Sequence, residues 1–371
     1  MAEVFYQGAK DVFLTKVRAD FDAVEDQAMR AVTALEDNGL LESETTPNGL
    51  FTDISNMTSE GDRAAWRHVA VTGLQALGGR KAGGDYPEGT FLRGYETAVF
   101  DPDNQDAIQQ TVPEERQDKE GIKYKAVLNR AQKQVTEIRR KNIGDPFDVF
   151  NLAFTLPASQ PVGGRFFNKG NQGLDGNLTA LAEPMVSTIH ARADGGVTIS
   201  NAVQVSGASA PFSDTNYYAG LEQAQGFKDD VGKPMPMLAG SKTIIVPPNN
   251  GLVRAVQELN KSEWKVGTAN NEVNVMKGEF ASIVSSPYLS TSYNAPTISN
   301  QKQWFVVDTD SREPEVGTGL VRITFIPTNA RVDRDWSHDA IVYKVKQSYV
   351  YGWTDFRNLI GSRGDSVSYS S

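Results

Sequence analysis

The run Thr243-Ile244-Ile245-Val246-Pro247-Pro248 predicts a buried β-strand that stops at two prolines. An uninterrupted series of β-branched residues is typical of a strand covered on both faces, and proline has no backbone N–H to offer a neighbouring strand. Apolar residues at helical spacing follow from Leu252 to Leu259. This strand and helix place a domain of mixed α and β structure in the last third of the chain.

The sequence on both sides continues the mixed pattern. The same patterns predict a helix over 214–225 and a turn over 228–234. They also predict strands at 197–199, 203–205, 280–284, 304–307, 321–326 and 341–351. The clearest strand is the last, in which aromatic and branched residues alternate with lysines from Ile341 to Tyr351. The short strands near 200 lie in a region rich in Gly, Ser, Thr and Asn that starts at Pro157.

The first 40 residues contain one amphipathic helical pattern. Apolar residues recur at steps of three and four from Phe13 to Leu35, and Asn38-Gly39 gives a C-terminal stop. The polar stretch that follows offers no local cover for this apolar face. We therefore expect a helix over 12–38 that packs on distant residues or on another copy of the chain.

A glycine-rich segment and a second helix follow. Glycines are dense over 73–94, and strand-like residues occupy 90–100, which predicts a hairpin-like excursion. A long helix is expected over 112–143, where the basic run Arg139-Arg140-Lys141 suits a helix C-terminus. Gly144-Asp145-Pro146 is expected to break it.

Composition excludes several classes of function. The 371 residues contain 37 Lys and Arg against 46 Asp and Glu, a net charge of −9, which argues against nonspecific binding to nucleic acid. The absence of cysteine excludes disulfides, thiol catalysis and thiolate metal sites. The N-terminus has no signal-peptide pattern, and no apolar stretch reaches the roughly 18 residues of a membrane span, so we expect a soluble cytoplasmic product.

Two ligand-binding patterns fail on spacing. Residues 226–233 are similar to a phosphate-binding loop, but the spacing is one residue too long and Pro234 replaces the magnesium-binding Ser or Thr. Asp101, Asp103 and Asp106 suggest a calcium loop, yet its twelfth position is Val112 instead of Glu.

The remaining polar motifs also favour a structural interpretation. Histidine occurs only at 68, 190 and 338, and His338 lies in an acidic run expected to form an exposed turn. Arg363-Gly364-Asp365-Ser366 matches an adhesion tripeptide, which we interpret as a chance occurrence in a flexible tail. We therefore expect no catalytic, cofactor-binding or metal-ligating residue.

A family resemblance begins at Phe212. Its residues are the helix cap Ser213-Asp214, the turn 229–234, the strand 243–248, Asn270-Asn271, Asn274-Val275, the segment 280–289, the strand 304–308 and the closing run 349–357. In this order they resemble the major capsid proteins of tailed bacteriophages with the Hong Kong 97-type fold, and the Mu-type head subunit in particular. These are packing and turn residues without a catalytic signature.

The resemblance implies an α+β capsid fold and assigns regions to the chain. The regions are an N-terminal arm (1–65), an extended loop (66–110), a peripheral domain with a long spine helix (111–210), a mostly axial domain (211–335), and a C-terminal strand returning to the peripheral domain with a flexible tail (336–371). Only the architecture of the N-terminal half matches the family.

The implied function is structural. Copies would form the pentamers and hexamers of an icosahedral shell around double-stranded DNA, made in the cytoplasm of a host bacterium and retained in the virion. Scaffolding, portal and decoration proteins would be partners, without sequence-specific DNA binding, enzyme activity, cofactor or membrane. Two alternatives remain open: a β-rich hydrolase or carbohydrate-active enzyme, in which paired acids act as acid and base, and a phage tail or baseplate component.

Overall fold

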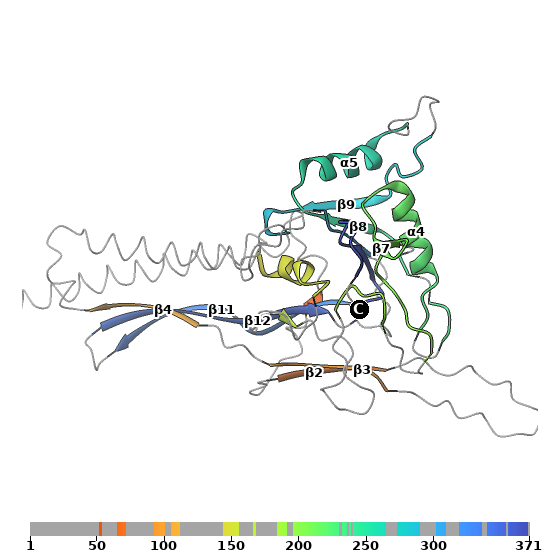
Figure 1. Cartoon of the computed structure of the whole chain (residues 1–371). Coiled ribbons are helices and arrows are strands. Elements are labelled where there is room, and N and C mark those ends of the chain that lie inside the picture. Colours follow the sequence, from red (N-terminus) through yellow and green to blue (C-terminus); the bar gives the residue numbers. More distant parts are fainter. Residues whose placement is uncertain are drawn as a thin grey trace, which may run out of the picture. The chain divides into compact units, whose positions relative to one another are not determined.

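The structure is a computed structural model, and it describes a defined part of the chain. The described residues are 52–53, 65–71, 93–100, 105–111, 144–155, 166–167, 184–190, 196–229, 232–235, 237–238, 240–264, 273–289, 302–308, 319–335, 340–353 and 355–369. They contain both helices and strands, so the expected α+β class is confirmed (Figure 1).

The chain divides into two compact units, and one sheet has residues in both. The first unit holds Met1–Leu40, Pro102–Asn142 and Phe325–Tyr349, and the second holds Leu41–Asp101, Ile143–Thr324 and Val350–Ser371. The long strands β11 (Leu320–Asp335) and β12 (Ala340–Trp353) contribute residues to each unit.

These two strands are the centre of a five-stranded sheet. Its order is β1-β11-β12-β4, with β5 also paired to β12. Within the first unit, β12 runs antiparallel to β4 (Gln105–Thr111), from Ala340 opposite Thr111 to Lys346 opposite Gln105. Within the second unit, β1 (Thr52–Asp53) is parallel to β11, and β5 (Phe166–Phe167) is parallel to β12.

Both long strands were expected, but β11 extends well beyond the expected 321–326. It spans 16 residues, and its second half is the polar run Thr328-Asn329-Ala330-Arg331-Val332-Asp333-Arg334-Asp335. Such a run has no alternating apolar pattern, so the sequence gives no strand signal there. The strand continues because β12 lies beside it and pairs with its backbone.

A four-stranded mixed sheet forms the body of the second unit. Its order is β13-β10-β8-β9, from strands β8 (Lys242–Val246), β9 (Phe280–Ser285), β10 (Trp304–Asp308) and β13 (Leu359–Ser362). β8 is parallel to β9 and antiparallel to β10. Ile244, Ile245 and Val246 of β8 are fully buried, as expected for its β-branched run.

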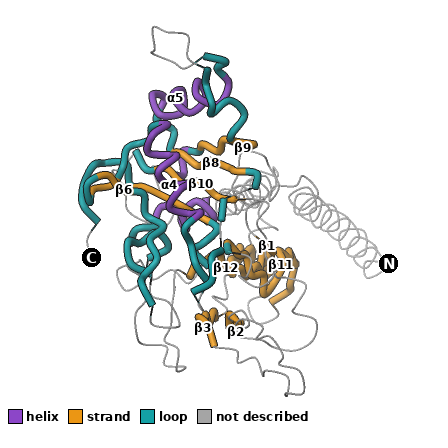
Figure 2. Tube along the Cα trace, turned by 90° about the vertical axis from the view of Figure 1, so that its right-hand side faces the viewer, coloured by secondary structure: helices purple, strands orange, loops and turns teal. Residues whose placement is uncertain are grey.

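Two helices lie beside this sheet (Figures 1 and 2). α4 (Asp214–Gln225) matches the expected helix, and the Ser213 hydroxyl accepts a hydrogen bond of 3.2 Å from the Asn216 N–H at its start. α5 (Asn250–Lys261) is capped in the same way by the Asn249 side chain, which accepts from the Gly251 N–H at 3.1 Å. Both caps satisfy N–H groups that the first turn of a helix leaves open.

Smaller elements complete the described part. β2 (Ala65–Val71) pairs antiparallel with β3 (Arg93–Phe100), so residues 72–92 connect two paired strands, as the hairpin-like excursion requires. β6 (Gln204–Val205) and β7 (Ala208–Ser209) form a two-residue hairpin, and η4 (Pro287–Leu289) is one turn of 3-10 helix after β9. The expected helices over 12–38 and 112–143 lie outside the described residues.

One helix was not expected, and two local expectations were wrong. Residues 144–151 are helical, and Pro146 lies in the first turn of this helix, where proline is well tolerated. Residues 197–199 form only a single bridge, from Ile199 to His190, instead of a strand. The tail is not free: β13 pairs with β10, and 355–362 are buried. β13 (Leu359–Ser362), a strand that the sequence analysis did not predict, thus joins the sheet of β8–β10.

Candidate functional site

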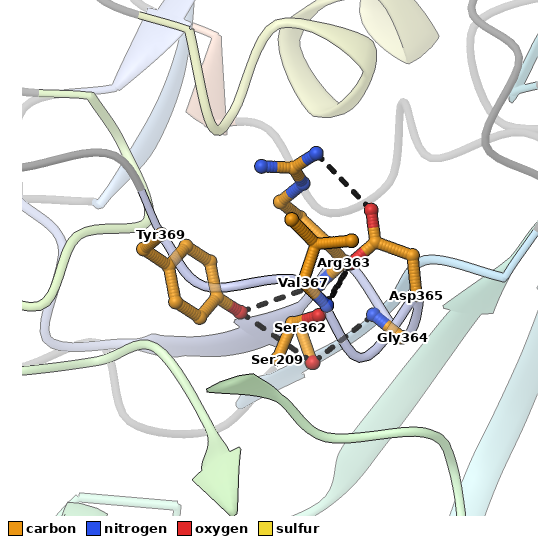
Figure 3. Close-up of polar contacts among 7 residues, drawn as sticks. All are labelled: Ser209, Ser362, Arg363, Gly364, Asp365, Val367 and Tyr369. Carbon is orange, nitrogen blue, oxygen red and sulfur yellow. Dashed lines mark hydrogen bonds and ion pairs between the residues drawn. The ribbon is translucent and has the colours of Figure 1, made fainter. Parts of the chain in front are cut away.

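The richest described set of polar contacts lies at the C-terminus (Figure 3). We call it the C-terminal cluster, and it consists of Ser209, Ser362, Arg363, Gly364, Asp365, Val367 and Tyr369. Ser209 is the last residue of β7, and the other members lie in or directly after β13. The cluster therefore connects two segments more than a hundred residues apart in the sequence.

Asp365 is the acceptor at the centre of this cluster. Its carboxylate accepts hydrogen bonds from the Ser209 hydroxyl at 2.5 Å and the Val367 N–H at 3.1 Å, and it pairs with the Arg363 guanidinium at 3.1 Å. Burial alone would raise the pKa of Asp365, but these contacts hold it below its ordinary value of 3.8. The carboxylate therefore stays charged and bound to these three partners.

Hydroxyl groups occupy the other side of the cluster. The Ser362 hydroxyl accepts from the Gly364 N–H at 3.2 Å and donates to the Ala210 carbonyl at 2.7 Å. The Tyr369 hydroxyl accepts from the Arg363 N–H at 3.3 Å, and burial raises the pKa of this phenol. The Ala210 carbonyl also accepts from the indole N–H of Trp304 at 2.9 Å. Ser362 of β13 and Trp304 of β10 thus bind the same carbonyl, which helps to hold the two strands together.

A second polar network joins α4 to the four-stranded sheet. The Glu279 carboxylate lies 2.8 Å from the Tyr217 hydroxyl and 2.9 Å from the Lys242 ammonium. Burial alone would raise the pKa of Glu279, but the hydrogen bonds from Lys242 and Tyr217 lower it overall. Burial and the bond to Glu279 raise the pKa of Tyr217, so this phenol keeps its proton. Because the Tyr217 phenol is neutral and the Glu279 carboxylate is already ion-paired, their contact favours a structural role for both side chains.

His190 lies in a buried aromatic stack. Its ring lies 3.7 Å from the Phe356 ring, with 8° between the planes, and its Nε2 is 3.0 Å from the Asn201 side-chain oxygen. The Asn201 side-chain amide donates to the Met185 and Phe356 carbonyls at 2.9 and 3.3 Å. Since Asn201 Oδ1 is an acceptor in this arrangement, His190 Nε2 carries the proton. The contact joins residues 185–201 to the segment after β12.

Asp355 and Arg357 form a buried ion pair on the same segment. Their side chains are 4% and 3% exposed, and the closest atoms are 2.7 Å apart. The guanidinium also donates to the Lys228 carbonyl at 3.3 Å and lies 5.0 Å above the Phe356 ring centre. These contacts anchor the expected turn 228–234, in which the Lys233 N–H donates to the Asp229 carboxylate at 2.7 Å.

The patterns that failed on spacing do not form sites in the described residues. Asp106 pairs with Val345 inside a strand, whereas Asp101, Asp103 and His338 lie outside the described part. His68 is in β2. Among the residues that the structure covers, no three His, Cys, Asp or Glu side chains gather at a spacing suited to a metal ion. No helix in those ranges has the length and apolarity for crossing a membrane.

The sequence analysis missed the C-terminal cluster and the buried Asp355–Arg357 pair. The signals available were weak, because Ser, Gly and Tyr after residue 361 are typical of a solvated tail. Leu359-Ile360 was the one apolar pair that could have indicated a short strand. Its partner strand lies more than 50 residues earlier, which no local pattern reveals.

Comparisons with known proteins gave matches among solved structures alone. No protein-family model and no curated protein matches the chain. The capsid of an empty GTA particle matches with 8% identity and a TM-score of 0.42, covering 86% of this chain and 89% of that one. The cyanophage P-SCSP1u capsid matches with 11% identity and a TM-score of 0.43, covering 84% of this chain and 85% of that one.

A further match is the capsid of Ralstonia phage GP4, with 10% identity and a TM-score of 0.43, covering 84% of this chain and 87% of that one. All three structures are capsids. The narrower likeness to the Mu-type head subunit stays a prediction.

Proposed function

We propose that this chain is the major capsid protein of a tailed bacteriophage, which assembles with many copies of itself into an icosahedral shell around double-stranded DNA. One observation carries the proposal: the elements after Phe212 form in the order that the sequence resemblance implies. The cap at Ser213, α4, β8, α5, β9 and β10 follow one another with the expected residues. That order defines the body of the second unit.

The long strands support a subunit that covers its neighbours. β11 and β12 have 16 and 14 residues, whereas a mean strand has about 5–6. With no cysteine in the chain, the shell would stand without disulfides between copies. Obligate interfaces of this kind bury on the order of 2,000–5,000 Å². Repetition of each contact by symmetry would then stabilise the closed particle.

We assign regions by the same resemblance, with one revision. The N-terminal arm is 1–65, the extended loop 66–110, the peripheral domain with its spine helix 111–210, and the axial domain most of 211–335. β12 belongs to the returning C-terminal part. β13 is assigned to the axial domain, because it pairs with β10 in the sheet of β8 and β9.

The proposed partners follow from the proposed role. Sister copies would form pentamers and hexamers, and separate scaffolding, portal and decoration proteins would complete the particle. The net charge of −9 suits a wall that does not bind packaged DNA tightly. We place the protein in the virion, after assembly in the cytoplasm of the host bacterium, and assign it no enzymatic step.

The test is the size and symmetry of the expressed protein. Light scattering and electron cryo-microscopy should show closed shells, or rings of five and six copies. Coexpression with the neighbouring structural genes of its source would supply a scaffold if shells need one. A stable 40.5 kDa monomer that cleaves a glycan would favour the hydrolase alternative and overturn the proposal. Open tubes or a baseplate-like complex would favour the tail alternative.

A deletion tests the extended loop. Removing Gly78–Pro87 shortens the connection between β2 and β3 but leaves both paired strands in place. We expect the subunit to fold, with the same far-UV spectrum, and the yield of closed particles to fall. A matched variant replaces the same ten positions by Gly and Ser, which keeps the length and removes the side chains. Normal shells from both variants would refute the loop assignment.

A further inference from the structure

The last described residues contact parts of the second unit that precede them by 50 residues or more. We call residues 355–369 the closing segment. It contains β13, which pairs along its length with β10, from Trp304 opposite Ser362 to Val307 opposite Leu359. On its other side the Gly361 carbonyl accepts from the Val203 N–H at 2.9 Å, and the Gly361 N–H donates to the Asn201 carbonyl at 3.1 Å. β13 therefore lies between two parts of the chain that precede it in the sequence, β10 and residues 201–203.

Apolar contacts of the closing segment reach further elements. Phe356, Leu359 and Ile360 are at most 3% exposed. The Ile360 side chain lies against Gly220 of α4, where an added Cβ would come within 2.8 Å of it. A Cβ added at Gly361 would come within 2.7 Å of the Phe305 ring, so a larger residue would not fit there. The segment thus fills the space between α4 and the sheet.

Polar contacts extend along the end of the segment (Figure 3). Asp365 binds Ser209, and the Val367 carbonyl accepts from the Ser209 N–H at 3.0 Å. Gly364 has a φ of +65°, and an added Cβ would overlap the Lys302 carbonyl oxygen. Glycine is therefore required there on two grounds, backbone conformation and space.

Without the closing segment, the second unit lacks partners for groups that it buries. The backbone of β10 that faces β13 would be unpaired, as would the polar groups of residues 201–203. The Phe305 ring would lose its contact with Gly361, and Gly220 of α4 would lose the Ile360 side chain beside it. Exposed apolar surface of this kind makes an incomplete chain prone to association.

We propose that folding of the second unit depends on the closing segment. Because residues 361–369 make the last of its contacts, the unit closes only after these residues have left the ribosome. Chains that lack them then fail to reach the folded state that joins a shell. The folding part stands by itself, and the part about the shell rests on the proposed function.

Truncation tests the folding part. A chain ending at Asn358 should lose the protease resistance of the second unit, with digestion on the order of tenfold faster or more. A chain ending at Tyr369 keeps every described residue and is the control. A synthetic peptide of residues 355–371, added during refolding, should restore resistance to the shorter chain. The same peptide with Gly364→Ala should fail, because this position has a positive φ and an added Cβ would overlap Lys302.

Stalled nascent chains test the timing. The full chain is fused to linkers of increasing length before a translational arrest site, and protease resistance of the second unit is measured on the ribosome. Resistance should appear only at linkers long enough to free residue 369 from the exit tunnel. A resistant second unit in chains that still hold residues 355–369 inside the tunnel would overturn the proposal. So would normal resistance of the chain ending at Asn358.

Particle assembly separates this inference from the proposed function. If full-length protein is folded and resistant but forms no particles under any condition, the proposed function fails and the folding dependence stands. If the chain ending at Asn358 enters particles as readily as the full chain, the dependence on the closing segment fails and the proposed function stands.

Discussion

The Tyr217 hydroxyl donates a hydrogen bond of 2.8 Å to the Glu279 carboxylate, and this contact joins α4 to the residue that precedes β9. Tyr217 is fully buried, and its ring packs edge-on against the Phe280 ring at 5.1 Å. Lys242, the first residue of β8, neutralises the same carboxylate at 2.9 Å. A single acidic side chain therefore holds one helix and one strand together.

Removing the hydroxyl should weaken this junction. Tyr217→Phe keeps the ring packing and loses one hydrogen bond to a charged group, so we expect a loss of about 1 kcal/mol in the free energy of unfolding of the second unit. The value is at the low end because Glu279 is partly solvated. Urea denaturation followed by circular dichroism measures it. Tyr218→Phe, on the more exposed neighbour, is the control and should leave the midpoint unchanged.

Acidification should remove the contribution of Glu279. Its pKa in the folded chain is below the ordinary value of 4.5, because the bonds from Lys242 and Tyr217 outweigh burial. The carboxylate therefore contributes its full stabilisation above about pH 4.5 and loses it as the pH falls through the folded pKa. Thermal unfolding from pH 7 to pH 3 should show wild type and Glu279→Gln converging at the acid end. A constant difference between them would contradict this.

Filling the contact between α4 and β13 should be costly. Gly220→Leu would place a side chain where Ile360 and Val203 already lie within 3 Å of an added Cβ. Overpacking of this kind costs about 1–3 kcal/mol, more than the gain in helix propensity. Ala219→Leu, exposed on the same helix, adds the same side chain without overpacking and should be close to neutral. Comparable melting temperatures for both variants would show that β13 does not pack against α4.

Separating the buried ion pair should cost more than deleting it. Asp355→Asn leaves Arg357 charged at 3% exposure, which we expect to destabilise the second unit by about 3–5 kcal/mol. Adding Arg357→Met removes the uncompensated charge, so the double variant should recover a large part of the loss. Chemical denaturation of both variants decides this. A double variant as unstable as the sum of two independent losses would indicate that the Lys228 contact dominates.

Elements with a local signal were predictable. α4 begins at Ser213 and β8 contains the whole β-branched run, because a cap or a buried strand depends on residues a few positions apart. The extended half of β11 was not predictable, since its polar residues become a strand only beside β12. The helix 144–151 was missed because Gly and Pro were interpreted as a break.

The C-terminal residues show the same division most clearly. Leu359, Ile360, Gly361 and Ser362 are too few and too mixed to specify a strand by pattern, and the following Arg363-Gly364-Asp365 looks like a solvated turn. The strand forms because the open side of β10 and the groups of residues 201–203 need hydrogen-bond partners. Neighbouring residues in the sequence therefore decided where the helix caps and the buried β-branched strand lie, and the absence of cysteine excluded disulfides. Pairing between distant segments decided that residues 355–362 would be buried, since only the folded sheet brings those backbone groups within bonding distance.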